Sequence, residues 1–190
     1  VAMTGGGALV IKQEGSSNGC TTGNPYTGII SGTGSFTKDG AGSLYFSGTN
    51  TNTTTANTYT GNTTIRAGKL ILGTVTPWGA GGTVTVASGA TLDLNGKAVT
   101  PTNALVLNGA YSQYVGALSN SGAYIGVYAG TITLGSTSTI GGSNVINLTS
   151  TNPITGAYDL TLAGSSGVVS TITGDIATGT GGLIVNGSTV

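Results

Sequence analysis

The sequence predicts an all-β protein, a right-handed parallel β-helix (β-solenoid) in which residues 1–190 form a single repeat segment. Three observations lead to this fold class. Gly (36 residues), Thr, Ser and Asn together make up more than half of the chain, and only 5% of residues are charged instead of the typical ~25%. Apolar residues occur in short alternating pieces between glycines, without helical spacing. These pieces recur along the whole chain, which is typical of a repeat architecture.

The first element of the pattern occurs in two copies. Gly5–Ile11 and Gly40–Phe46 both read G-x-G-x-L-x-Φ, where Φ is apolar, and each is followed by N-x-Y-T-G, at Asn24–Gly28 and at Asn57–Gly61. Further short alternating pieces continue to the C-terminus, at residues 64–73, 82–96, 105–109, 131–135, 145–148, 160–164 and 183–187. A helix is unfavourable here, because each interior Gly costs about 1 kcal/mol relative to Ala.

The apolar residues of these pieces are the predicted core. One short piece cannot bury its apolar face alone, so stacked coils must bury it together. We therefore expect the following side chains to point inward: Leu44, Leu70, Leu72, Val84, Val86, Leu92, Leu94, Leu105, Leu107, Ile132, Leu134, Ile146, Leu148, Leu160, Leu162 and Leu183. A β-sandwich or β-prism is the alternative fold, although a sandwich usually has longer strands.

Residues 34–48, 57–73 and 89–96 resemble the autotransporter-associated β-strand repeat, and the match is specific over residues 30–96. This repeat is found in passenger domains of bacterial autotransporters. The resemblance implies a right-handed parallel β-helix, export across the outer membrane and display at the bacterial cell surface. It also implies an adhesin, an aggregation factor or a stalk, since few such passengers carry an enzymatic module.

The residues that usually perform chemistry are scarce. The chain has no His, which excludes His-based triads and His-containing zinc sites. The sequence predicts no catalytic, cofactor-binding or metal-ligating residue, and hence no enzyme and no cofactor. Formal net charge is zero, no stretch is basic enough for nucleic acid, and no apolar run is long enough for membrane insertion. The alternative function is a polysaccharide-degrading β-helix, which needs carboxylates converging on one groove.

The ten charged residues are expected on the outside of the coil. Lys38 and Asp39 are interpreted as a solvated turn before Gly40. Asp93, between two leucines, is expected to face outward. Asp159 and Asp175 are the only acids close to one coil apart, and they could stack, although they are better interpreted as turn residues.

Three further features have two interpretations. Tyr111, Tyr114, Tyr124 and Tyr128 form either a patch that contacts a sugar or a partner, or an excursion that covers the coil. The single cysteine, Cys20, is interpreted as a small buried residue, with an intermolecular bridge as the alternative. Thr-x-Thr pieces starting at residues 83, 131, 137 and 171 suggest a hydroxyl–methyl array of the ice-binding type, but their irregular spacing argues against register on successive coils.

The predicted function is an extracellular, non-enzymatic stalk or fibre segment that serves adhesion. The expected partners are other copies of the chain or flanking repeats, and a host-cell or surface glycan as ligand. The last piece, residues 179–187, aligns with residues 32–40, and the element that should follow it is the one with which the chain begins, at Gly5. We therefore expect head-to-tail joining, within a longer or polymerised protein.

Overall fold

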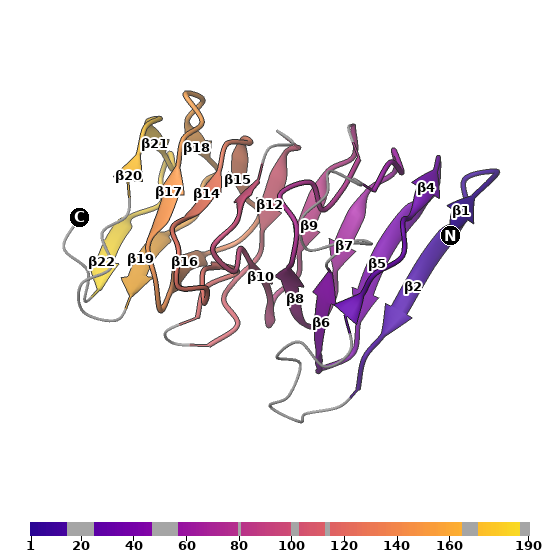
Figure 1. Cartoon of the computed structure of the whole chain (residues 1–190). Coiled ribbons are helices and arrows are strands. Elements are labelled where there is room, and N and C mark those ends of the chain that lie inside the picture. Colours follow the sequence, from indigo (N-terminus) through magenta and orange to yellow (C-terminus); the bar gives the residue numbers. More distant parts are fainter. Residues whose placement is uncertain are drawn as a thin grey trace.

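The computed structural model is all-β over the residues that the structure describes, which are 1–14, 25–46, 57–79, 81–99, 103–112, 115–164 and 171–186. No helix occurs in these residues, and all strands pair in parallel. Coil after coil lies side by side along one axis, with the two termini at opposite ends (Figure 1). The predicted parallel β-helix is confirmed.

Two eight-stranded sheets run the length of the coil. The first, called the β2–β21 sheet, contains β2 (Ala8–Lys12), β5 (Ser35–Asp39), β7 (Thr63–Ile65), β9 (Val84–Val86), β12 (Leu105–Leu107), β15 (Ile132–Leu134), β18 (Ile154–Thr155) and β21 (Ile176–Ala177). The second, the β3–β22 sheet, contains β3 (Pro25–Tyr26), β6 (Ser43–Phe46), β8 (Gly68–Leu72), β10 (Ala90–Asp93), β13 (Leu118–Ser119), β16 (Ser138–Gly142), β19 (Leu160–Gly164) and β22 (Leu183–Asn186).

A third sheet of four strands supports the C-terminal half. It contains β11 (Ala98–Val99), β14 (Gly126–Tyr128), β17 (Ile146–Leu148) and β20 (Thr171–Ile172). Near the N-terminus, β1 (Ala2–Met3) pairs with β4 (Ser31–Gly32). Short strands suit this arrangement, because each coil must turn after a few residues to close around the core.

The core consists of columns of like side chains from successive coils. In the β3–β22 sheet, Leu44, Leu70, Leu92, Leu118, Ile140 and Leu162 lie in register. Of the sixteen residues predicted to point inward, all are buried except Leu183, which is 50% exposed. Leu183 continues an inward column because it pairs with Leu160, but no described strand lies on the other side of β22 to cover it.

Aromatic rings fill the interior of the N-terminal coils. Phe36 and Phe46 stack with ring centroids 5.0 Å apart, and Tyr59 packs on Phe36 at 6.3 Å. Phe36 comes from one long sheet and Phe46 from the other, so this pair joins the two sheets across the core. Between these strands the chain turns at Gly40, which has φ of 77°. A side chain there would be strained and would collide with the carbonyl oxygen of Gln13.

Candidate functional site

Lys38 is buried, so the predictions that it lies in a solvated turn and that all charged residues are outside are wrong. Its residue is 0% exposed within β5, and its Nζ donates hydrogen bonds to the main-chain carbonyls of Asp39 (2.8 Å), Gly40 (2.7 Å) and Ala67 (2.9 Å). Burial lowers the pKa of Lys38 to about 8, while the neighbouring carboxylates oppose this change. Lys38 thus occupies a core position whose partners in the adjacent coils are Ile11 and Ile65.

Asp93 is also buried, at 3% exposure. It alternates with Leu92 and Leu94 in β10 and so faces away from the core, but the following coil covers it. Its Oδ1 accepts hydrogen bonds from the main-chain N–H groups of Asn95 and Ser121, both at 2.9 Å. The bond from Ser121 links two coils, and the two bonds together fix this carboxylate within the fold.

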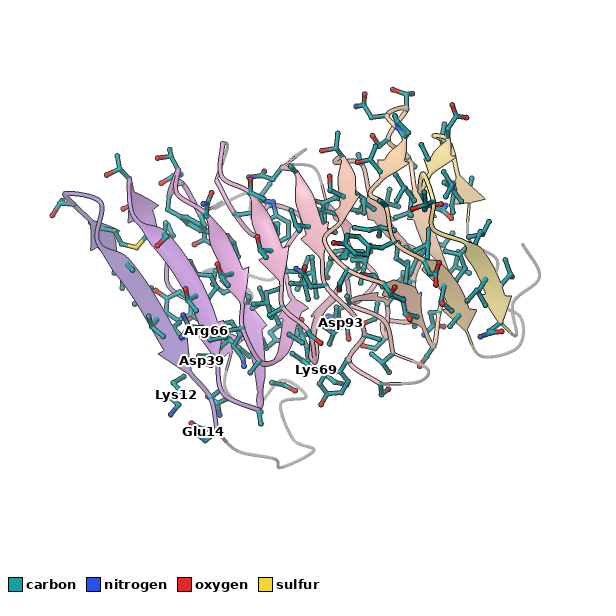
Figure 2. All side chains as sticks on the ribbon, turned by 180° about the vertical axis from the view of Figure 1, so that it is seen from behind. Lys12, Glu14, Asp39, Arg66, Lys69 and Asp93 are labelled. Atoms are coloured by element: carbon teal, nitrogen blue, oxygen red, sulfur yellow. The ribbon has the colours of Figure 1, made fainter. Side chains whose placement is uncertain are left out.

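Two of the other acids, Glu14 and Asp39, lie beside basic side chains. Glu14 pairs with Lys12 at 2.6 Å, and Asp39 lies 3.6 Å from Arg66. Figure 2 shows these pairs near one edge of the N-terminal half. Within the described ranges, no three residues of the types His, Cys, Asp and Glu come together in a way that could hold a metal ion.

Asp159 and Asp175 do not stack, and each lies in the segment that leads into a strand, in agreement with their interpretation as turn residues. Asp159 precedes β19 in the β3–β22 sheet, and its Oδ1 accepts a hydrogen bond from Gly182 N at 2.6 Å. Asp175 precedes β21 in the other long sheet. The two are sixteen residues apart, which is less than one coil here, so they fall on different sides of the solenoid.

The tyrosine cluster divides between core and surface. Tyr128 is fully buried, and its hydroxyl donates a hydrogen bond to the carbonyl of Asn103 at 2.5 Å. Tyr111 and Tyr124 are exposed, at 36% and 80%. Tyr114 and Cys20 lie outside the described residues. This segment therefore supplies one core side chain and two exposed rings, and contact of these rings with a sugar or a partner stays a prediction.

One of the exposed aromatic side chains, Tyr111, lies beside a cation. Lys69 Nζ is 4.9 Å from the centroid of the Tyr111 ring, within the range of a cation–π interaction. Tyr45 lies one strand away, on the same outer face, because Ser43 pairs with Lys69 and Tyr45 pairs with Ile71. We call Tyr45, Lys69 and Tyr111 the tyrosine–lysine patch.

The outer face next to the tyrosine–lysine patch is covered. Thr91, Asp93 and Ser119 on the adjacent strands face outward by alternation yet are buried, whereas Tyr45 and Lys69 are half-buried. The chain after β12 therefore covers β10 and β13 but leaves β6 and β8 accessible. Strand alternation alone could have found Lys69 and Tyr45, but nothing in the sequence placed Tyr111 beside them, 42 residues after Lys69.

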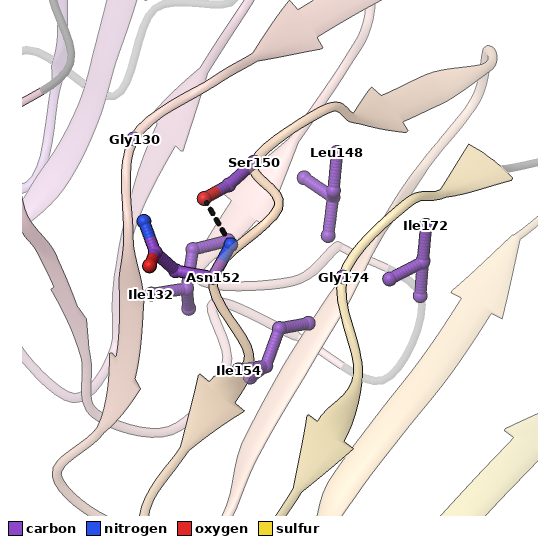
Figure 3. A pocket seen from close by; sticks show the side chains of 8 residues that line it. All are labelled: Gly130, Ile132, Leu148, Ser150, Asn152, Ile154, Ile172 and Gly174. Carbon is purple, nitrogen blue, oxygen red and sulfur yellow. Dashed lines mark hydrogen bonds between the residues drawn. The ribbon is translucent and has the colours of Figure 1, made fainter.

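A small internal gap lies among the C-terminal coils (Figure 3). It is lined by Gly130, Ile132, Leu148, Ser150, Asn152, Ile154, Ile172 and Gly174, and its volume of about 10 Å³ suits one water molecule. The Ser150 hydroxyl in its wall accepts a hydrogen bond from Asn152 N at 3.2 Å. No acid or base lines the gap, so it carries no chemistry.

The fold places the chain in the class of parallel β-helix proteins. No protein-family model matches the chain, and neither a curated protein nor a solved structure does. A helix of sufficient length and apolar character to cross a membrane is not found in the described part of the chain.

Proposed function

We propose that this chain is a non-enzymatic structural and adhesive segment, displayed at the bacterial cell surface as part of an autotransporter-type passenger. The observation that carries the proposal is the pair of eight-stranded parallel ladders around a continuous apolar core. Such a ladder is stiff along its axis, since each coil is hydrogen-bonded to the next. With five Lys and Arg residues in all, one of them buried, the chain also offers few sites to trypsin-like proteases.

The distribution of acids supports a non-enzymatic role over the polysaccharide-degrading alternative. Asp93 is engaged by two N–H groups, Asp39 and Glu14 lie beside basic side chains, and Asp159 and Asp175 lie at different sheets. A glycoside-cleaving site needs two carboxyl groups within about 5–10 Å across the scissile bond.

An activity assay separates these two functions. We expect the purified chain to release no reducing ends or unsaturated products from a panel of neutral and acidic polysaccharides, and to survive trypsin while folded. Turnover that disappears in the Asp159→Asn or Asp175→Asn variant would contradict the proposal and establish the enzyme. Labelling of intact, unpermeabilised source cells with an antibody tests the surface location.

Self-association from end to end is supported by the two end faces. On β22, Leu183, Ile184 and Val185 are 44–50% exposed, and β22 pairs with β19 on one side only within the described residues. At the other end, the inward-facing Leu9 and Ile11 of β2 are only partly buried. All five basic residues lie at or before Lys97, whereas Asp159 and Asp175 lie after it, so the two halves carry opposite net charge. Opposite charge favours head-to-tail over head-to-head contact.

The alternation of β22 offers a matched pair of variants. Val185 pairs with Leu162 and continues an inward column, whereas Ile184 faces outward. If a second copy stacks on β22, we expect Val185→Lys to abolish oligomers, because a charge would enter the inward column. Ile184→Lys should leave the oligomers intact. Light scattering over a concentration series and negative-stain electron microscopy measure this. Monomers at every concentration in the unsubstituted chain would exclude head-to-tail joining of copies.

The tyrosine–lysine patch is the proposed adhesive surface. Exposed rings stack on sugar faces, and an ammonium group binds acidic sugars. We expect a glycan array to show preference for acidic glycans that Lys69→Ala and Tyr111→Ala each reduce at least fivefold. Lys97→Ala is the control, since Lys97 is a cation outside the patch. Equal binding by all variants would remove the patch from the proposal.

A further inference from the structure

The outer face of the β2–β21 sheet has a column of small, uncharged side chains that no role above uses. One outward residue from the middle of each strand aligns across the sheet, in the order Val10, Thr37, Thr64, Thr85, Val106, Thr133, Thr155 and Ala177. All but the last are β-branched. We call the five members from β7 to β18, Thr64 to Thr155, the threonine column.

A second column runs beside it. The residues two positions before Thr64, Thr85, Val106 and Thr133, which directly precede β7, β9, β12 and β15, are Asn62, Thr83, Ala104 and Thr131. Their carbonyls accept hydrogen bonds from the neighbouring strand, which fixes their positions relative to one another. Neither column contains a charged or aromatic residue between β7 and β15.

The irregular spacing of Thr-x-Thr pieces in the sequence does not prevent this alignment. Thr64 and Thr85 are 21 residues apart, and Val106 and Thr133 are 27 apart, yet both pairs are in register. The connections between strands take up the difference in coil length. The pieces at Thr83 and Thr131 therefore both lie on this face, although the coil between them carries Ala104 and Val106 and the motif does not recur on successive coils.

Repeat distances in the column follow from sheet geometry. Neighbouring members are separated by the strand spacing of about 4.8 Å, and the two columns by two residues of strand, about 6.7 Å. Thr133 Oγ1 and Thr155 Oγ1 lie 3.3 Å apart, so hydroxyl groups approach one another along the column. The members are half-buried or exposed, and β-branching restricts their χ1 angles. The array is thus accessible and preorganised.

We propose that the threonine column binds the surface of ice. The lattice planes of ice repeat in two directions at distances of this size, and an array of hydroxyl and methyl groups can order water on the same repeat. The hydroxyls donate and accept hydrogen bonds, and the methyls exclude water from the gaps between them. Charged groups would hold their own hydration shells. The third outward position, two residues after each column member, carries Arg66 after β7 and then the uncharged residues Ala87, Asn108 and Gly135.

A crystalline polysaccharide is the other partner with a flat repeat. Proteins hold such surfaces largely by stacking aromatic rings on sugars. None of the described rings belongs to the threonine column: most lie in the core or on the tyrosine–lysine patch, and Tyr124 and Tyr158 are exposed on other segments. The chemistry of the column therefore favours ordered water.

Thermal hysteresis and inhibition of ice recrystallisation test the proposal with ice itself as the probe. We expect the 190-residue chain to produce both, and Thr85→Lys, at the centre of the column, to reduce thermal hysteresis at least fivefold. Thr161→Lys is the matched control, because Thr161 faces outward from β19 on the other long sheet. It should keep hysteresis within twofold. Circular dichroism melting of all three proteins identifies any loss of fold. Thr85→Val is a second variant, which retains the β-branched shape and removes one hydroxyl.

Three results would overturn the inference. The first is no hysteresis and no recrystallisation inhibition by the folded, unsubstituted chain at millimolar concentration. The second is an equal loss in Thr85→Lys and Thr161→Lys. The third is binding to crystalline cellulose or chitin that Thr85→Lys abolishes, which would assign the face to a polysaccharide.

Discussion

The two long sheets have similar interiors and very different exteriors. Inside, both carry mainly Leu, Ile and Val, which are almost fully buried apart from the strands at the two ends, and the β2–β21 sheet also buries Phe36 and Lys38. Outside, the β2–β21 sheet carries the threonine column, whereas the β3–β22 sheet carries Tyr45, Lys69, Asp93 and Ser119 within two rows. Part of that second face is covered by the following coil, while the first face stays open over β7 to β18.

This difference shows that folding and surface function are separable in a coil of this kind. The inward positions are mostly restricted to apolar side chains, because each one packs on the inward side chains of the neighbouring coils. The outward positions have no such restriction, so one face can be uniform and the other mixed. Four predictions sharpen or break this comparison.

The largest effect is expected inside, and it should be the same for both sheets. Leu92→Ala in β10 and Leu105→Ala in β12 each empty a fully buried position in the middle of a column. We expect each to lower the free energy of unfolding by about 2–5 kcal/mol. Urea denaturation followed by circular dichroism measures it. A cost of less than 1 kcal/mol at either site would mean that the two interiors differ in packing.

The covered and open outer faces should respond differently to truncation. Asp93→Ala removes the acceptor of two main-chain N–H groups, those of Asn95 and Ser121, and should cost about 1–3 kcal/mol. Thr85→Ala on the open face should change stability by no more than about 0.5 kcal/mol. Asp93→Asn, which keeps one oxygen, is the control and should fall between them. Equal costs for Asp93→Ala and Thr85→Ala would contradict the difference between the faces.

Lys38 makes the interior of the β2–β21 sheet sensitive to pH. Its pKa is about 8 in the folded chain and 10.5 in the unfolded chain, so between these values the unfolded state binds more protons. The free energy of unfolding should therefore rise with pH from about 8, by about 1–2 kcal/mol after allowance for partial hydration. Burial raises the pKa of Tyr59 to about 12, which opposes the rise above pH 10.

Urea denaturation between pH 7 and 9.5 measures this effect. Lys38→Met keeps the length of the side chain without the charge, and it should lose the rise with pH. The same slope in both proteins would show that Lys38 does not titrate in this range.

The smallest effect on stability is expected at the tyrosine–lysine patch. Lys69→Ala and Tyr111→Ala each remove one cation–π contact at an accessible site, worth about 0.5–1 kcal/mol. A double-mutant cycle isolates the contact from other losses. A coupling energy near zero would show that the pair contributes only to binding, not to the fold.

The sequence by itself determined the repeat, the fold class and the identity of the core. Alternation between glycines marks Leu70, Leu92 and Leu107 as inward residues, because a strand of period two has one apolar face. The same rule gave the outward direction of Asp93, and it applies equally to Lys69. The prediction for Lys38 failed for a different reason. A Lys close to a Gly was interpreted as a solvated turn, whereas three main-chain carbonyls accept hydrogen bonds from its buried ammonium group.

Only the tertiary structure decided which outward residues become neighbours. Coils of unequal length are brought into register by hydrogen bonds between strands, so Thr64 meets Thr85 across 21 residues and Val106 meets Thr133 across 27. The same stacking brings Tyr111 to Lys69, buries Asp93 under the next coil and separates Asp159 from Asp175. Sequence distance does not contain this information, because the connections between strands vary in length while the strand spacing does not.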